Sequence, residues 1–139
     1  MSLANFRNWE ESHRRELGEV FEMLSQSLSD EPELLVGQLS DIEAWNARIQ
    51  YLLAEANSWL ESLSALNIPE KHDKSELERK ILLASAVSEP KQIRDKIGAL
   101  CDSIKTRITL GQSLLKYHVT NQAITMQKPK LNEILGENQ

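Results

Sequence analysis

Apolar residues recur every seven positions through the middle of the chain, between Pro32 and Asn67. A repeat sustained over four heptads is typical of a helix that supercoils with partner helices. We therefore predict one helix over residues 32–67, roughly 50 Å long at about 1.5 Å per residue. We call its repeating residues the seam: Ile42, Ile49, Ala56 and Leu63 at one position, and Trp45, Leu52, Trp59 and Leu66 at the other.

A second apolar stripe predicts a shorter helix near the amino terminus. Steps of three and four residues place side chains on one face of an α-helix. Asn5 is the expected N-cap, and Ser29 is the expected last residue because Pro32 suits the first turn of the next helix. The stripe consists of Phe6, Trp9, His13, Leu17, Val20, Phe21, Leu24 and Leu28.

Two further helices are predicted after Pro69. The run Asp73-Lys74-Ser75-Glu76 offers an N-cap acceptor with a Glu three residues later, close to a capping box. We expect a break or sharp kink at Pro90, and then a helix over residues 90–126 whose inward face approximates the 11-residue repeat of a nearly straight helix. That face contains Ile93, Ile97, Leu100, Ile104, Ile108, Gly111, Leu115 and Val119.

Gly111 on this face favours the close approach of another helix, because it carries no side chain. Lys128-Pro129-Lys130 is expected to end the regular structure, leaving residues 129–139 as a polar tail. Within the tail, Leu131, Ile134 and Leu135 predict either one docked helical turn or a short partner-binding peptide.

The predicted fold class is therefore all-α: an elongated antiparallel bundle of three to four long helices with coiled-coil-like packing. Residues 1–128 form its single domain, since 139 residues suffice for one core and are too few for two ordinary ones. The scarcity of helix breakers, with 5 Gly and 4 Pro, agrees with this class.

Charge divides the chain into two unequal parts. Residues 1–90 hold 8 Lys or Arg against 17 Asp or Glu, whereas residues 91–139 hold 8 against 4, for a total of -5. We expect the basic last helix to lie against acidic helices of the same or a neighbouring subunit.

Cys101 is the one cysteine, so no internal disulfide framework is expected. The first residues turn polar too early for a secretory signal, and no apolar run reaches the roughly 20 residues that cross a bilayer. These features favour a cytoplasmic protein.

No motif in the sequence predicts catalysis. A carboxylate-bridged di-iron bundle needs two Glu-x-x-His pairs, and only Glu10-x-x-His13 is present. Cys101 follows the inward Leu100 and is expected to be a small buried residue. The five glycines are isolated, which excludes a Gly-rich phosphate loop. We predict no enzyme, metal or cofactor; an active site would have to be assembled across subunits.

The first functional hypothesis is a non-enzymatic protein–protein interaction or assembly module. We expect the seam to be too long for its neighbours within one chain to cover, and we therefore predict a homo-oligomer. Large tryptophan side chains are frequent interface anchors. The predicted contact residues are Trp45, Leu52, Trp59 and Leu63.

The alternative is a protein that associates with nucleic acid or binds an anionic ligand through the basic last helix. Binding through phosphate contacts weakens steeply as salt rises, which separates the two hypotheses. The candidate cations are Lys105, Arg107, Lys116, Lys128 and Lys130.

Two resemblances accompany these hypotheses. The run from Asp41 to Ile49, followed by Leu52 and Leu53, resembles the first helix of a spectrin-like three-helix repeat over about a dozen residues. The short acidic chain of capped helices with its Lys-Pro-Lys tail also resembles small helical proteins encoded by bacteriophages and prophages. That second resemblance implies a viral accessory role, such as binding a host protein, and identifies no residues.

Overall fold

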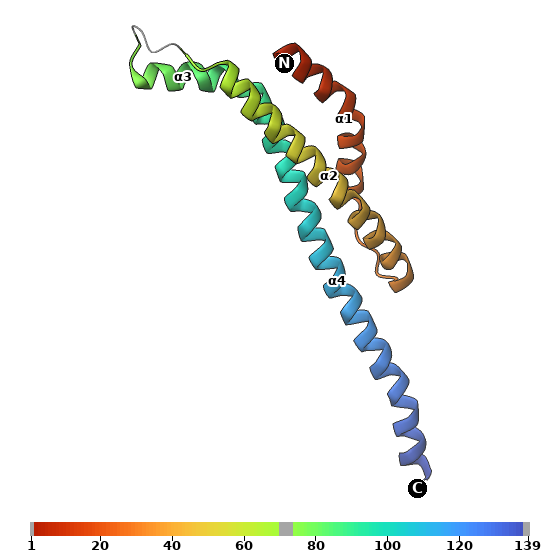
Figure 1. Ribbon diagram of the computed structural model, residues 1–139. Helices are drawn as coiled ribbons and strands as arrows, with labels where there is room; N and C mark the ends of the chain where they lie inside the picture. Colours follow the sequence, from red (N-terminus) through yellow and green to blue (C-terminus); the bar gives the residue numbers. More distant parts are fainter. Residues whose placement is uncertain (1, 70–73, 138–139) are drawn as a thin grey trace.

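The computed structural model describes the backbone of residues 2–69 and 74–137, and side chains as far as residue 124. Within these ranges the chain is helical and contains no strand, which confirms the all-α prediction. The chain forms an elongated bundle from which one long helix projects (Figure 1). The helices are α1 (Leu3–Ser25), α2 (Pro32–Leu66), α3 (Glu76–Ala86) and α4 (Ser88–Glu137).

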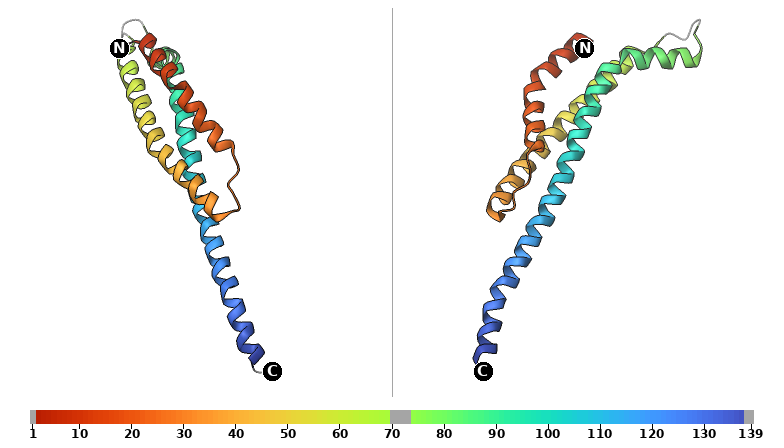
Figure 2. Two further views of the ribbon diagram at one scale, coloured as in Figure 1. Left: turned by 90° about the vertical axis from the view of Figure 1, so that its right-hand side faces the viewer. Right: turned by 180° about the vertical axis from the view of Figure 1, so that it is seen from behind.

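Helices α2 and α4 form the main contact of the fold and run antiparallel, side by side (Figures 1 and 2). Leu39 meets Gly111 at one end of the pair, where an added Cβ on the glycine would lie 2.2 Å from Leu39 Cδ2. The predicted close approach at Gly111 is therefore confirmed. Between its ends the pair buries Ile42, Ile49, Leu52, Ala56, Ile97, Cys101 and Ile104.

Helix α1 completes the bundle by lying against both α2 and α4. It runs parallel to α4, since Arg7 near its start pairs with Glu89 and its last turn lies beside Arg107. Its two fully buried residues, Phe6 and Val20, enter two separate apolar clusters. Helix α1 is thus packed against the bundle near both of its ends.

The bounds of α1 differ from the prediction. Ser2, rather than Asn5, is the N-cap, and its hydroxyl accepts from the Asn5 amide at 3.2 Å. The helix ends at Ser25 instead of Ser29, because Gln38 on α2 holds the following segment in an extended course. The Gln38 side-chain amide accepts from the Ser29 N–H at 2.7 Å and donates to the Ser27 carbonyl at 3.1 Å.

The short helix α3 begins close to the N-cap that the sequence predicts. Ser75 accepts from the Glu78 amide at 3.1 Å, so the cap lies two residues after Asp73, which is outside the described residues. The break before α4 falls at Val87, and Pro90 lies in the first turn of α4, a position that proline tolerates. Helix α3 points away from the bundle axis (Figure 2).

The far end of α4 also differs from the prediction, because the helix continues through Pro129 to Glu137. A proline inside a helix costs about 3 kcal/mol, but it leaves only one carbonyl without its usual donor, and water can bond an exposed carbonyl. The triplet Leu131, Ile134 and Leu135 lies outside the described side chains. Among the described residues, no helix is long and apolar enough to span a membrane.

The inward face of α4 follows a seven-residue spacing rather than the predicted 11-residue one. It ends with Leu115 and His118, both half-buried, whereas Val119 is 59% exposed. Val119 was therefore wrongly placed on this face. The spacing matches α2, and two helices with the same repeat keep one face in contact over a longer distance.

Candidate interaction surface

The predicted contact residues on α2 pack inside the chain. Leu52 and Leu63 are buried, and Trp45 and Trp59 are half-buried against the two apolar clusters. Helices α1 and α4 cover most of the seam, so the expectation that one chain is too short to cover it is wrong. Leu66, at the end of the seam, is 63% exposed. A contact between these tryptophans and another chain stays a prediction.

Glu55 on α2 organises the contact with α1. Its carboxylate accepts from Trp9 Nε1 at 2.8 Å and lies 3.9 Å from His13 Nε2. The His13 ring also packs edge-on against Trp9, with ring centroids 5.2 Å apart. Glu55 raises the pKa of the exposed Tyr51 phenol, chiefly by a hydrogen bond. His13 therefore belongs to a structural contact between helices.

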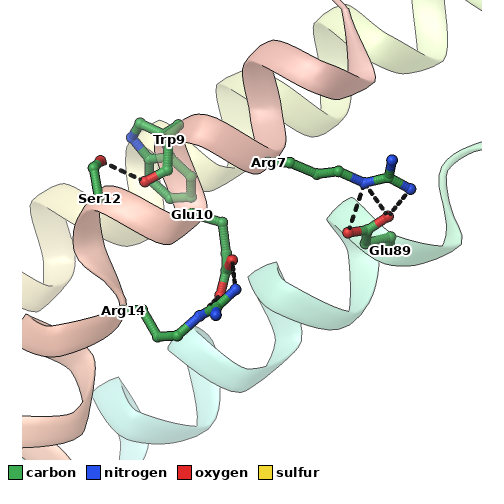
Figure 3. A network of polar contacts seen from close by, with 6 residues as sticks. All are labelled: Arg7, Trp9, Glu10, Ser12, Arg14 and Glu89. Atoms are coloured by element: carbon green, nitrogen blue, oxygen red, sulfur yellow. Dashed lines mark hydrogen bonds and ion pairs between the residues drawn. The ribbon is translucent and has the colours of Figure 1, made fainter.

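Ion pairs join the helices in a different way from the predicted one. Arg7 on α1 binds Glu89 on α4 through Nη2 at 3.0 Å, and Figure 3 shows this pair beside the Glu10–Arg14 pair within α1. Among the described side chains, no cation of α4 pairs with an acidic residue of another helix. The predicted position of the basic α4 against acidic helices is therefore confirmed by its contacts with α1 and α2, but ion pairs from its described cations do not hold it there.

Arg107 on α4 is engaged in holding the end of α1. Its guanidinium donates to the Gln26 carbonyl at 2.6 Å and to the Leu24 carbonyl. Carbonyls at a helix C-terminus lack partners and carry partial negative charge, so a cation there satisfies both needs. An incoming phosphate would have to compete with these bonds.

The other predicted cations do not gather around Arg107. Lys105 and Lys116 are exposed and lie 11 residues apart on one flank of α4, roughly 16 Å along the axis. Residues two apart in a helix point in different directions, which separates Lys105 from Arg107. Lys128 and Lys130 have no described side chains. The predicted cations whose side chains are described, Lys105, Arg107 and Lys116, therefore form no compact anion site.

A large apolar groove lies between α1 and α4, with a volume of about 1100 Å³. Phe21 on one wall is 67% exposed and Leu110 on the other is 52% exposed. Glu10 and Arg14, drawn in Figure 3, lie at its rim on α1. We call this the α1–α4 groove; its apolar lining includes Leu17, Phe21, Leu24, Ile93, Leu100 and Leu110.

The outer half of α4, residues 119–137, extends beyond the other helices (Figures 1 and 2). Tyr117 at its base is 60% exposed, and Ile124 within it is 52% exposed. Leu110, Tyr117 and Ile124 are spaced by seven residues, a pattern that is present in the sequence but lies outside the predicted inward face. This spacing gives α4 a second apolar strip.

Helix α3 offers a smaller uncovered surface. None of its residues is buried, and Leu77, Ile81 and Leu82 are 68%, 59% and 44% exposed. Leu83 packs, partly buried, against the cluster of Phe6, Leu63 and Val87, whereas the three exposed apolar side chains of α3 are left uncovered.

The described part of the chain contains no group of three His, Cys, Asp or Glu residues that could hold a metal ion. Cys101 is 2% exposed between α2 and α4. Burial raises the pKa of its thiol, Asp102 raises it further, and Lys105 opposes them.

Comparison of the chain with protein-family models, with curated proteins and with solved structures found no match.

Proposed function

We propose that the chain is a non-enzymatic protein–protein interaction module that self-associates through the outer half of α4. The observation that supports this proposal is the projection of α4 past α1 and α2 with Tyr117 and Ile124 exposed. Burial of a large apolar side chain contributes roughly 1.5–3 kcal/mol, so covering these residues favours association.

The backbone of the outer half supports the same proposal. A helix gains most of its stability from packing rather than from its own hydrogen bonds. Residues 119–137 continue α4 past the helices that pack against its inner part, and they include Pro129, which weakens the helix further. A partner helix would supply the missing stabilisation.

The nucleic-acid alternative has weaker support. Arg107 is bonded to the end of α1, and Lys105 and Lys116 occupy a flank without a binding cleft among the described pockets. A viral accessory role that targets a host protein is compatible with an interaction module, and it stays a prediction.

The test is the native mass of the full chain, measured by size-exclusion chromatography with light scattering at low and high salt. We expect about twice 15.8 kDa at both salt concentrations, because apolar contacts are not weakened by ionic screening. Ile124→Lys should shift the mass toward 15.8 kDa, whereas Gln122→Lys, at an exposed polar position on the opposite side of α4, should not. A monomer under every condition would contradict the proposal.

Salt-dependent binding of a duplex oligonucleotide by a monomeric chain would instead support the alternative. Adding the oligonucleotide to the same light-scattering experiment distinguishes the two functions.

A further inference from the structure

We propose that the α1–α4 groove is the docking site for the outer half of α4 from a second copy of this chain. In this arrangement each copy inserts its projecting helix into the groove of the other. The inference rests on the proposed self-association and adds the surface, the occupant and the direction of the contact.

The groove has the character of a helix-binding site. Its walls are two parallel helices, and apolar residues such as Leu17, Leu24 and Leu100 line it. Charged residues stand among them, including Lys96 and Asp102. An apolar groove between helices is a common receptor for the apolar face of an amphipathic helix.

The occupant is indicated by the pattern on α4 itself. Ser103 and Leu110 line the groove, and the same seven-residue spacing leads to Tyr117 and Ile124 beyond the end of α1. The groove and the projecting helix are therefore two parts of one continuous strip. A strip that is half receptor and half ligand is self-complementary, as a symmetric dimer requires.

The lengths of the two parts agree. The groove spans residues 93–110 of α4, and the outer half spans residues 119–137. At about 1.5 Å per residue, each is roughly 27 Å long. One projecting helix thus fills one groove from end to end.

The direction of the docked helix follows from the symmetry of the dimer and from the directions of the neighbouring helices. An antiparallel arrangement places a twofold axis near residues 114 and 115, midway between the groove and the outer half, and fills both grooves in a closed dimer. A parallel arrangement would insert each copy into the next and produce an open filament. The antiparallel helix also opposes both α1 and α4, which gives the alternating directions of a four-helix bundle.

Cysteine cross-linking of the full chain tests this register. An axis near residues 114 and 115 brings position 106 of one copy close to position 124 of the other. A mixture of Thr106→Cys and Ile124→Cys should therefore form a disulfide-linked dimer under mild oxidation, while each variant alone should not. Both positions are exposed within one chain, and the buried Cys101 should remain unlinked in the unsubstituted protein.

Lys105→Cys provides the matched control, since Lys105 is exposed on the flank of α4 away from the groove. Its mixture with Ile124→Cys should give no link. Ile124→Cys linking to itself, or a light-scattering dimer whose Thr106→Cys and Ile124→Cys mixture fails to link, would overturn the inference while leaving self-association intact. A monomeric unsubstituted chain would overturn both proposals.

A second pair of variants tests the surface without cross-links. Leu110→Lys in the groove should raise the dimer dissociation constant about tenfold or more. Val119→Lys should leave it nearly unchanged, because Val119 is similarly exposed but lies off the strip. Circular dichroism confirms that both variants remain helical. Equal weakening by the two substitutions would contradict docking in the groove.

Discussion

Gly111 sets the distance between the two longest helices, because α2 approaches it closely through Leu39. A Cβ there would meet Leu39 Cδ2 at 2.2 Å and Cγ at 3.0 Å, and Leu39 is itself buried. The gain in helix propensity from alanine, about 1 kcal/mol, is therefore opposed by overpacking of about 1–3 kcal/mol. At most positions in a helix, overpacking would not oppose the gain in helix propensity from alanine.

We predict that Gly111→Ala lowers the free energy of unfolding by up to about 2 kcal/mol, as measured by urea denaturation at one protein concentration. Gly37→Ala is the matched control in α2: it has no atom within 4 Å of its added Cβ and should raise stability by about 0.5–1 kcal/mol. Combining Gly111→Ala with Leu39→Ala should remove the penalty from the added methyl group. Equal stabilisation by the two glycine substitutions would contradict the close approach.

Cys101 gives a residue-scale prediction about pH. Burial raises the pKa of its thiol in the folded chain, whereas the thiol of the unfolded chain has the ordinary pKa of about 8.5. Below that pH both states hold the proton, and the stabilising contribution is fully present. As pH rises further the unfolded state loses the proton first, so the contribution declines.

The free energy of unfolding should therefore fall as the pH rises above about 8.5, and Cys101→Ala should flatten this slope. Labelling by a thiol reagent should be slow in the native protein and fast in urea. Rapid labelling of the native protein would show that the thiol is not buried.

The sequence allowed some of these residues to be interpreted correctly and others not. Gly111 and Cys101 were placed by the spacing of their apolar neighbours, which is a local property of α4. Arg107 was taken for a ligand-binding cation because its role depends on where α1 ends, and α1 ends at Ser25 through contacts with Gln38. Long-range polar contacts of this kind leave no periodic signal in the chain.

At the scale of elements, α2 was predicted to within one residue because a proline starts it and a heptad pattern runs through it. The end of α4 was not predicted, since the proline rule ignores how readily water satisfies one freed carbonyl. The projecting strip was also missed. Its seven-residue spacing is visible, but only the fold shows that the α2-facing strip is a different one.

Replacing the two serine N-caps should have different effects on the free energy of unfolding, because their helices pack differently. Ser2 caps α1, which contributes Phe6 and Val20 to the core, whereas Ser75 caps α3, which contributes only the partly buried Leu83. Ser2→Ala should lower the global free energy of unfolding by about 1 kcal/mol. Ser75→Ala should leave that energy nearly unchanged and accelerate amide exchange only in residues 76–86.

Amide hydrogen exchange with urea denaturation distinguishes the two effects. A similar global loss in both variants would indicate that α3 is packed against another surface in solution.

At the scale of the whole molecule, the chain is an asymmetric object with a covered core and an uncovered extension. Helices α1, α2 and the inner part of α4 cover one another's apolar residues, so the monomer has a core of its own. The groove is open, Tyr117 and Ile124 on the projecting part of α4 are exposed, and the groove and the projecting part match in length. Mutual insertion would cover both in one symmetric contact.

The most direct measurement of this central claim is amide hydrogen exchange of residues 119–137 across a dilution series. A paired helix should exchange slowly at high concentration and become unprotected as the dimer dissociates, while the core amides of residues 97–111 stay protected throughout. Rapid exchange of residues 119–137 at every concentration would mean that no second copy covers this helix, and it would contradict self-association through α4.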